Sequence, residues 1–162
     1  MKQLKDITLF LYILGGAILF GGTVYQMIVM VPEFSRDIPN GMIGLAHSQV
    51  KPKLFWTSPL LPAGFLLGII ALVLNWKTKR RYWLLASCLV GIAAEVFTII
   101  YFYPRLKIMG IIDGNPSADM ALLTRSIRQW ITADRIRFIV MVLPAFILGL
   151  KALAVPAKPA AN

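Results

Sequence analysis

One acidic residue interrupts an apolar stretch of the chain, and it is the first candidate for chemistry. Glu95 lies within residues 82–103, where every other residue is uncharged. Placing a carboxylate at the centre of a bilayer costs roughly 2.5–3.5 kcal/mol. A carboxylate kept at such a depth acts as a general base, anchors a polar ligand, or forms a structural ion pair that locks neighbouring helices. The residue type alone leaves these three interpretations open.

A cationic partner for this acid lies before the last apolar stretch. Trp130, Asp134 and Arg137 are spaced i, i+4 and i+7, which places them on one face of a helix. We expect Arg137 to reach inward to Glu95, with Asp134 orienting the guanidinium. The alternative is that Arg137 extends to lipid headgroups, as we expect of Arg135.

Further polar side chains occur inside or beside the apolar stretches. Tyr25, Gln26 and Thr98 are expected to bond neighbouring helices or, together with Trp130, to line a ligand site. His47, the one histidine of the chain, is either a proton shuttle or a solvated loop residue. A single histidine without clustered cysteines or carboxylates does not form a metal site, so no metal and no cofactor are expected.

The apolar stretches themselves define the expected fold. Of the 162 residues 58% are hydrophobic and only 15% are charged. A helix needs about 20 apolar residues to cross a bilayer. We therefore predict an all-α integral membrane four-helix bundle, a single domain over residues 1–155, with a disordered tail at 156–162. The four spans are predicted at residues 7–31, 54–75, 82–103 and 136–155.

Prolines and periodicity refine this prediction. Pro32 and Pro104 are expected to end the first and third spans, and Pro144 to kink the fourth near Val140. In residues 117–131 apolar side chains recur at helical spacing with arginines between them. This pattern predicts an additional amphipathic helix at the membrane interface, before the last span.

Charge and glycine placement indicate the partners. The net charge is +10, but the basic residues gather at the ends of apolar stretches, as in 77–81. That distribution favours membrane lipids as partners and argues against nucleic acid. The dense basic turn predicts that the termini are cytoplasmic, and we expect the membrane to be a bacterial inner membrane. Gly15 with Gly22, and Gly64 with Gly68, form small-residue faces that pack helices closely, inside the chain or in a homo-oligomer.

Three local motifs support a family resemblance. The first span runs into proline at residues 30–33, and the third runs from Thr98 into Pro104 at residues 98–104. Before the last span, Trp130 is followed by Asp134 and Arg137. With four spans in this order, most of the chain resembles the anthrone-oxygenase-like family of small four-helix membrane proteins.

The resemblance implies that some members oxidise electron-rich polycyclic phenols without a cofactor, whereas most bacterial members have no known activity. Two functions are therefore carried forward. The first is a membrane protein of uncharacterised activity whose polar site around Glu95 and Arg137 binds a small amphiphile or a partner protein. The second is a membrane oxidoreductase in which Glu95 is the general base and Arg137 stabilises the anion. An enzyme requires a pocket of roughly 300 Å³ or more at these residues.

Overall fold

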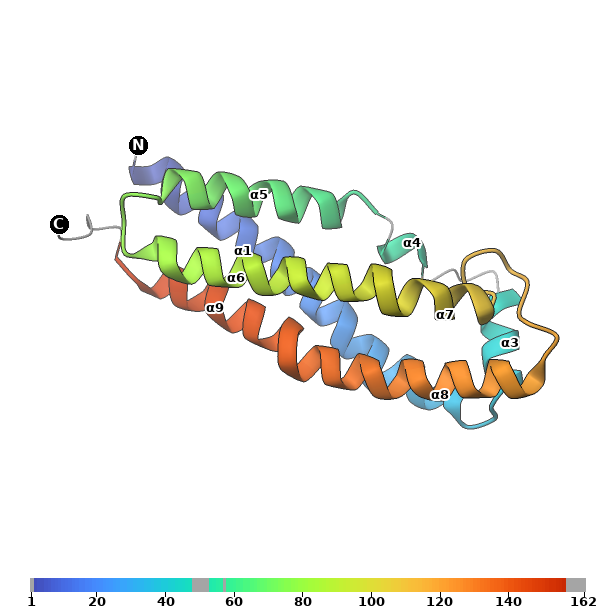
Figure 1. Ribbon diagram of the computed structural model, residues 1–162. Helices are drawn as coiled ribbons and strands as arrows, with labels where there is room; N and C mark the ends of the chain where they lie inside the picture. Colours follow the sequence, from blue (N-terminus) through green and yellow to red (C-terminus); the bar gives the residue numbers. More distant parts are fainter. Residues whose placement is uncertain (1, 48–52, 57, 157–162) are drawn as a thin grey trace. The chain divides into compact units, whose positions relative to one another are not determined.

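The computed structural model describes residues 2–47, 53–56 and 58–156, and the chain is all-α (Figure 1). Within these residues, four helices are long and apolar enough to cross a membrane. The expected number of apolar helices long enough to be spans is therefore confirmed, and these helices indicate an integral membrane protein. The predicted tail lies outside the described residues, apart from Pro156. The candidate spans are Gln3–Ser35, Leu54–Leu74, Arg80–Ile108 and Met120–Ala154.

Three of these spans are built from α-helical and π-helical segments in direct succession. The first contains α1 (Lys2–Tyr25), η1 (Gln26–Met30) and α2 (Val31–Ser35). The third contains α6 (Arg80–Phe97), η2 (Thr98–Phe102) and α7 (Tyr103–Ile108). The fourth contains α8 (Met120–Arg137), η3 (Phe138–Val142) and α9 (Leu143–Ala154). Between the first and third lie α3 (Asn40–His47), α4 (Lys53–Trp56) and α5 (Leu60–Leu74).

Proline does not end the first and third spans, so the boundaries predicted at Pro32 and Pro104 were wrong. A proline inside a helix lacks the N–H group and crowds the carbonyl four residues earlier. Here each described π segment ends two residues before a proline, at Pro32, Pro104 and Pro144. The Val31 N–H group donates to the Gln26 carbonyl, five residues back. This wider turn accommodates the proline ring, so the helix continues.

No separate interfacial helix is found where we expected one, among the described residues before the last span. The amphipathic segment is the first part of α8, which runs on through η3 into α9. Neither proline nor glycine occurs between Met120 and Phe138, so nothing interrupts the helix. Asp119 caps its start by accepting the Ala121 and Leu122 N–H groups at 2.9 and 3.0 Å. The apolar face of α8 is buried in protein rather than in lipid.

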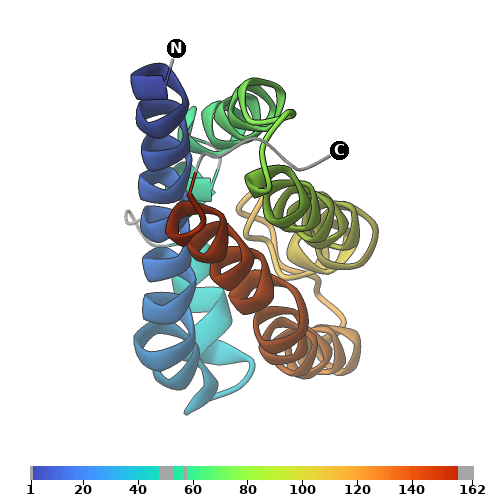
Figure 2. The same ribbon diagram turned by 90° about the vertical axis from the view of Figure 1, so that its left-hand side faces the viewer.

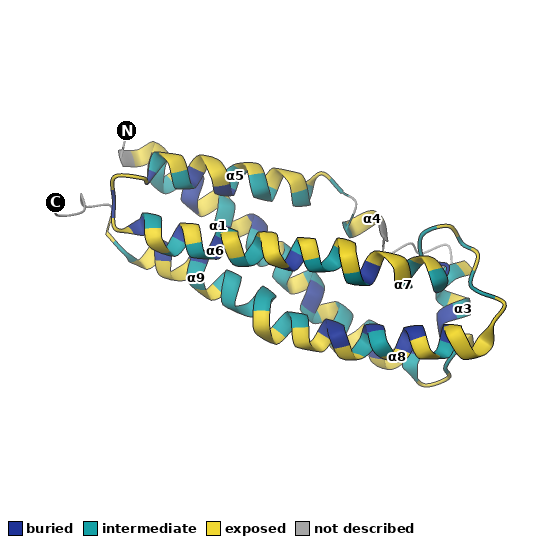
Figure 3. Ribbon diagram, viewed as in Figure 1, coloured by how far each residue is buried: buried dark blue, intermediate teal, exposed yellow. Residues whose placement is uncertain are grey.

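Large apolar side chains cover the outside of the spans. Ile28, Ile99 and Ile100 are 69%, 66% and 71% exposed, and exposed positions recur along the long helices in Figure 3. In water this surface would drive aggregation, whereas in a bilayer it meets acyl chains. The exposed surface therefore agrees with the hydropathy of the sequence.

Residue contacts divide the chain into two compact units, and the single domain remains a prediction. Unit 1 comprises Met1–Gly21, Pro59–Ala94 and Ile139–Asn162. Unit 2 comprises Gly22–Ser58 and Glu95–Phe138. The apolar core of unit 1 consists of Leu9, Ile13, Ala71, Leu84 and Ala152. That of unit 2 consists of Val31, Phe34, Met42, Phe102, Met109, Leu123, Ile127, Trp130 and Ala133.

Glycines allow close helix packing within unit 1. A Cβ atom added at Gly68 would lie 2.9 Å from the Tyr12 ring and 3.3 Å from the Cys88 sulfur. A Cβ atom added at Gly149 would lie 2.8 Å from Ile13. These two glycines therefore contribute to packing inside the chain. Nothing lies within 4 Å of a Cβ atom added at Gly15. Whether its face is used in a homo-oligomer remains a prediction.

Candidate functional site

A buried ion pair lies near the end of α8 in unit 2. The Nη2 atom of Arg137 is 2.8 Å from Oδ1 of Asp134, and the two side chains are only 12% and 2% exposed. Spacing of i, i+3 places both groups on the same face of the helix. Because both charges are withdrawn from solvent, the pair must be supported by further hydrogen bonds.

Two other helices supply these hydrogen bonds. Gln26 donates from Nε2 to Oδ2 of Asp134 at 3.0 Å. Arg137 donates from Nη1 to the Thr98 hydroxyl at 2.7 Å. Both carboxylate oxygens and both terminal guanidinium nitrogens therefore have partners. We call Gln26, Thr98, Asp134 and Arg137 the polar cluster; it joins the first, third and fourth spans.

Aromatic side chains enclose the polar cluster. The Arg137 guanidinium carbon lies 4.9 Å from the centre of the Phe102 ring. Trp130, which is 8% exposed, packs against Phe102 and Phe34 with centroid distances of 6.4 and 5.8 Å. An apolar enclosure strengthens the hydrogen bonds inside it and raises the cost of leaving any of them unmade.

Three residues of the polar cluster lie at the start of a π segment or directly before one. Gln26 is the first residue of η1, Thr98 is the first residue of η2, and Arg137 directly precedes η3. Local π turns often occur at functional sites in helices. The three prolines that require these wide turns are therefore connected with the position of the polar side chains.

Glu95 has a different environment from Asp134. It is half-buried, and it has neither a hydrogen bond nor a salt bridge among the described residues. Its charge interacts with that of Arg137, but the direct ion pair that we expected between them is not formed. Asp134 is the direct partner instead because it lies on the same helix, one turn away. The structure thus brings Glu95 to the polar cluster without including it in the hydrogen bonds.

Two of the candidate residues, Tyr25 and His47, take no part in the hydrogen bonds of the polar cluster. Tyr25 precedes Gln26 in the chain, but its side chain is 58% exposed. His47 is exposed and is the last residue of α3. The hydrogen bonds of the cluster described above include neither of these side chains. No group of three potential metal ligands is present in the part of the chain that the structure describes.

Two features of this region were missed in the sequence. Phe102 supplies the ring beneath Arg137. Its position four residues after Thr98 could have indicated that the two side chains share a helix face. Arg105 lies 3.6 Å from the Tyr101 ring centre, donates to the Tyr101 carbonyl at 2.7 Å and reaches Oε1 of Gln129 at 3.2 Å. No sequence pattern distinguished this arginine from one that extends to headgroups.

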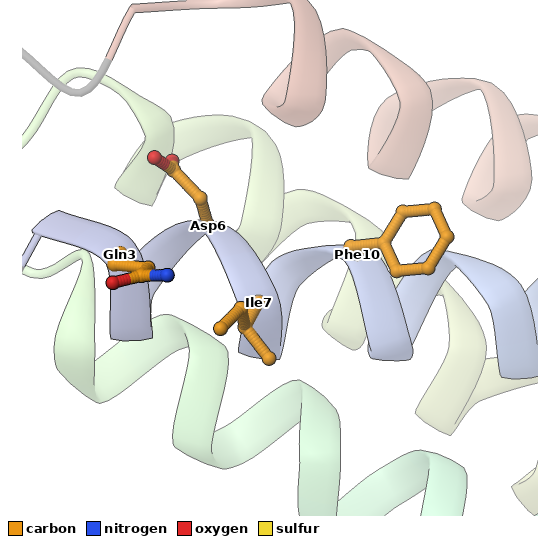
Figure 4. A pocket seen from close by; sticks show the side chains of 4 residues that line it. All are labelled: Gln3, Asp6, Ile7 and Phe10. Carbon is orange, nitrogen blue, oxygen red and sulfur yellow. The ribbon is translucent and has the colours of Figure 1, made fainter.

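A smaller polar contact occurs in unit 1. The Ser87 hydroxyl donates to the Ala145 carbonyl at 2.7 Å, so Tyr12 donates to Ser87 at 2.8 Å. An open depression of about 520 Å³ also lies on this unit, at the start of α1 (Figure 4). It is lined by Gln3, Asp6, Ile7 and Phe10 and includes neither Glu95 nor Arg137.

Comparisons of this chain with family models, curated proteins and solved structures find no match. The resemblance to the anthrone-oxygenase-like family therefore remains a prediction from the residues alone. The fold and the polar cluster define an integral membrane protein with buried charges in its helical interior.

Proposed function

We propose that this integral membrane protein binds a small amphiphile beside the polar cluster of unit 2, with Glu95 accepting a hydrogen bond from the ligand's polar head. One observation carries the proposal: Glu95 lies within a span, next to a buried arginine, without a hydrogen-bond or salt-bridge partner among the described residues. A structural ion pair would instead have its partner in contact.

The contrast with Asp134 supports this function. Asp134 already performs the structural task, because its carboxylate binds Gln26 and Arg137 and ties two helices together. Glu95 contributes no such bond, yet it carries the cost of a carboxylate within a membrane span. A ligand with a hydroxyl or amine group offsets that cost by donating to Glu95.

An unused hydrogen-bond donor on Arg137 restricts which ligands fit the site. Its Nε atom is buried and has no hydrogen-bond partner among the described residues. The site thus combines an acceptor on Glu95 with an unused donor on Arg137. A hydroxyl group both donates and accepts, so an alcohol or phenol suits the site better than a carboxylate, which would be repelled by Glu95.

Location follows from charge. We place the termini on the cytoplasmic side of a bacterial inner membrane, because residues 77–81, where the second span gives way to the third, include four basic residues and no acid. Lipids are the surrounding partners, and a homo-oligomer through the glycine faces is compatible with this function.

Binding of model amphiphiles to the protein in lipid nanodiscs tests the proposal. Native mass spectrometry should detect retained dodecanol but not dodecanoate. Glu95→Gln should weaken retention of dodecanol by about tenfold or more, as expected for loss of a hydrogen bond to a charged group. Ser87→Ala, which removes a buried hydroxyl from unit 1, is the matched control and should retain dodecanol as the parent does. Equal retention by the Glu95→Gln variant and the parent would refute the proposal.

The second candidate, cofactor-independent oxidation of a polycyclic phenol, uses the same observation. A carboxylate whose lone pairs are not engaged by the described residues is available to take a proton from a phenol. Oxygen consumption with anthrone in nanodiscs tests this reaction. Turnover that disappears in Glu95→Gln would support it, whereas binding of dodecanol without oxygen uptake would favour the binding function alone.

A further inference from the structure

Unit 1 carries a concentrated positive charge. Its residues include eight lysines and arginines but one acid, Asp6. That acid is already neutralised, because its carboxylate is paired with the Arg80 guanidinium. The remaining cations of unit 1 therefore have no acidic partner among its described residues.

Arg80 brings these cations to one end of the unit. Its side chain is buried, binds Asp6 at the start of α1, and donates from Nε to the Val155 carbonyl at 2.6 Å. Three chain segments are thereby joined: the start of α1, the start of α6, and the end of α9. Figure 2 looks onto this end of unit 1. The described cations gathered there are Lys5, Lys77, Lys79, Arg81 and Lys151; we call them the basic end.

Aromatic rings hold two members of the basic end in place. The Arg81 guanidinium carbon lies 4.7 Å from the Tyr82 ring centre, and its Nη2 donates to that hydroxyl at 2.6 Å. Lys151 lies 4.9 Å from the Trp83 ring centre. Tyrosine and tryptophan favour the level of the lipid headgroups. These contacts restrict the Arg81 and Lys151 side chains, so these two cations have less conformational freedom to lose on binding.

An apolar surface lies next to these charges. The depression at the start of α1 is lined in part by Ile7 and Phe10, which are 46% and 55% exposed (Figure 4). Asp6 also lines this depression and is paired with Arg80, whose neighbours in the chain are Lys79 and Arg81. The apolar side chains of α1 therefore lie close to the cations that flank the start of α6. A phospholipid has the same succession of anionic head and apolar chain.

We propose that the basic end of unit 1 is a binding site for an anionic phospholipid, with the headgroup phosphate on Lys77, Lys79 and Arg81 and an acyl chain along the α1 depression. The positive charges of these three side chains favour an anionic group such as a phosphate. Lipid is the occupant because these cations flank candidate spans and Arg81 lies over the Tyr82 ring, unlike the open basic face that nucleic acid requires. This site is independent of Glu95 and of the function proposed for unit 2.

Nanodiscs of mixed phosphatidylglycerol and phosphatidylcholine test the proposal, with lipids retained after release into detergent counted by native mass spectrometry. The parent protein should retain phosphatidylglycerol above its share of the mixture. The double variant Lys77→Gln/Lys79→Gln should lower that affinity by about tenfold, because each basic residue near the surface contributes to anionic-lipid binding. Both lysines are exposed, so the fold should survive.

The matched control is Arg125→Gln/Arg128→Gln, which removes two exposed cations from α8 in unit 2. It should leave phosphatidylglycerol retention unchanged, as should Glu95→Gln. Equal retention of the two lipids by the parent, or equal loss in the control, would overturn the proposal. Displacement of the lipid by millimolar glycerol phosphate would also overturn it, because the site would then be a phosphate site rather than a lipid site.

Discussion

Asp134 and Thr98 bind the two terminal nitrogens of one guanidinium, that of Arg137, from two different helices. The distances are 2.8 Å to the carboxylate and 2.7 Å to the hydroxyl. Gln26 binds the remaining carboxylate oxygen at 3.0 Å, so that three spans share one buried ion pair. We therefore expect this pair, rather than Glu95, to stabilise unit 2.

Asp134→Asn should destabilise the protein strongly. The substitution leaves the Arg137 charge buried without its counter-ion, and breaking a buried pair in this way costs about 3–5 kcal/mol. Chemical or thermal unfolding in detergent measures the loss. Glu33→Gln is the matched control: it breaks the exposed Glu33–Arg36 pair, whose side chains are 72% and 75% exposed, and should cost no more than about 1 kcal/mol. Equal effects would mean that the buried pair is unimportant for stability.

Glu95→Gln should leave the midpoint of unfolding nearly unchanged or raise it. The parent carboxylate makes no hydrogen bond or salt bridge with the described residues, so little is lost, and a neutral amide is easier to place within a span. The same unfolding assay measures the effect. A loss as large as that in Asp134→Asn would instead assign Glu95 a structural role and remove the basis of the proposed binding site.

Arg137→Lys should be destabilising although the charge is kept. A lysine ammonium cannot present the planar fork that binds Asp134 and Thr98 together, and it loses the stacking on Phe102. Loss of a hydrogen bond to a charged group predicts about 1.5–3 kcal/mol in the free energy of unfolding. Arg125→Lys, at an exposed position of α8, is expected to be neutral. If Arg137→Lys left the free energy of unfolding unchanged, a positive charge alone would be sufficient to stabilise this site.

Gly149→Ala should disturb packing in unit 1. The added Cβ atom would lie 2.8 Å from Ile13, and forcing an extra methyl group into a packed contact costs about 1–3 kcal/mol. Gly91→Ala, on α6 of the same unit, meets nothing within 4 Å and should stabilise its helix by about 0.5–1 kcal/mol. If both substitutions changed the free energy of unfolding in the same direction, the result would contradict close packing at Gly149.

Hydropathy was sufficient to predict how many spans the chain has, because each span must supply its own apolar surface and its own backbone hydrogen bonds. Their ends could not be predicted from Pro32 and Pro104. Whether proline ends a helix depends on what surrounds it, and here a wider turn allows the helix to continue. The amphipathic stretch before the last span had the correct periodicity, but its apolar face is buried against protein instead of lipid.

The site was partly visible in the sequence. Trp130, Asp134 and Arg137 were placed on one face by their spacing, and they are together in the structure. Glu95 was the leading candidate for a functional residue because it is the one charged residue of an apolar stretch. That same isolation explains why it has no partner among the described residues, whereas Asp134 has Arg137 one turn away. The contributions of Gln26 and Thr98 depend on how separate spans meet, which local spacing does not encode.

The π turns have one more consequence. Each holds one residue more than an α-helical turn, so deleting a single residue from η2 would restore regular helix geometry. Because the wide turn absorbs the extra residue, this deletion would leave the residues on either side of the turn facing nearly as they do now. Regular α-helix geometry without the deletion would instead rotate every later residue of that helix by about 100° relative to those before it. In this protein the extra residue of η2 thus sets the register in which Glu95, before the turn, and Arg105, after it, are presented on one helix.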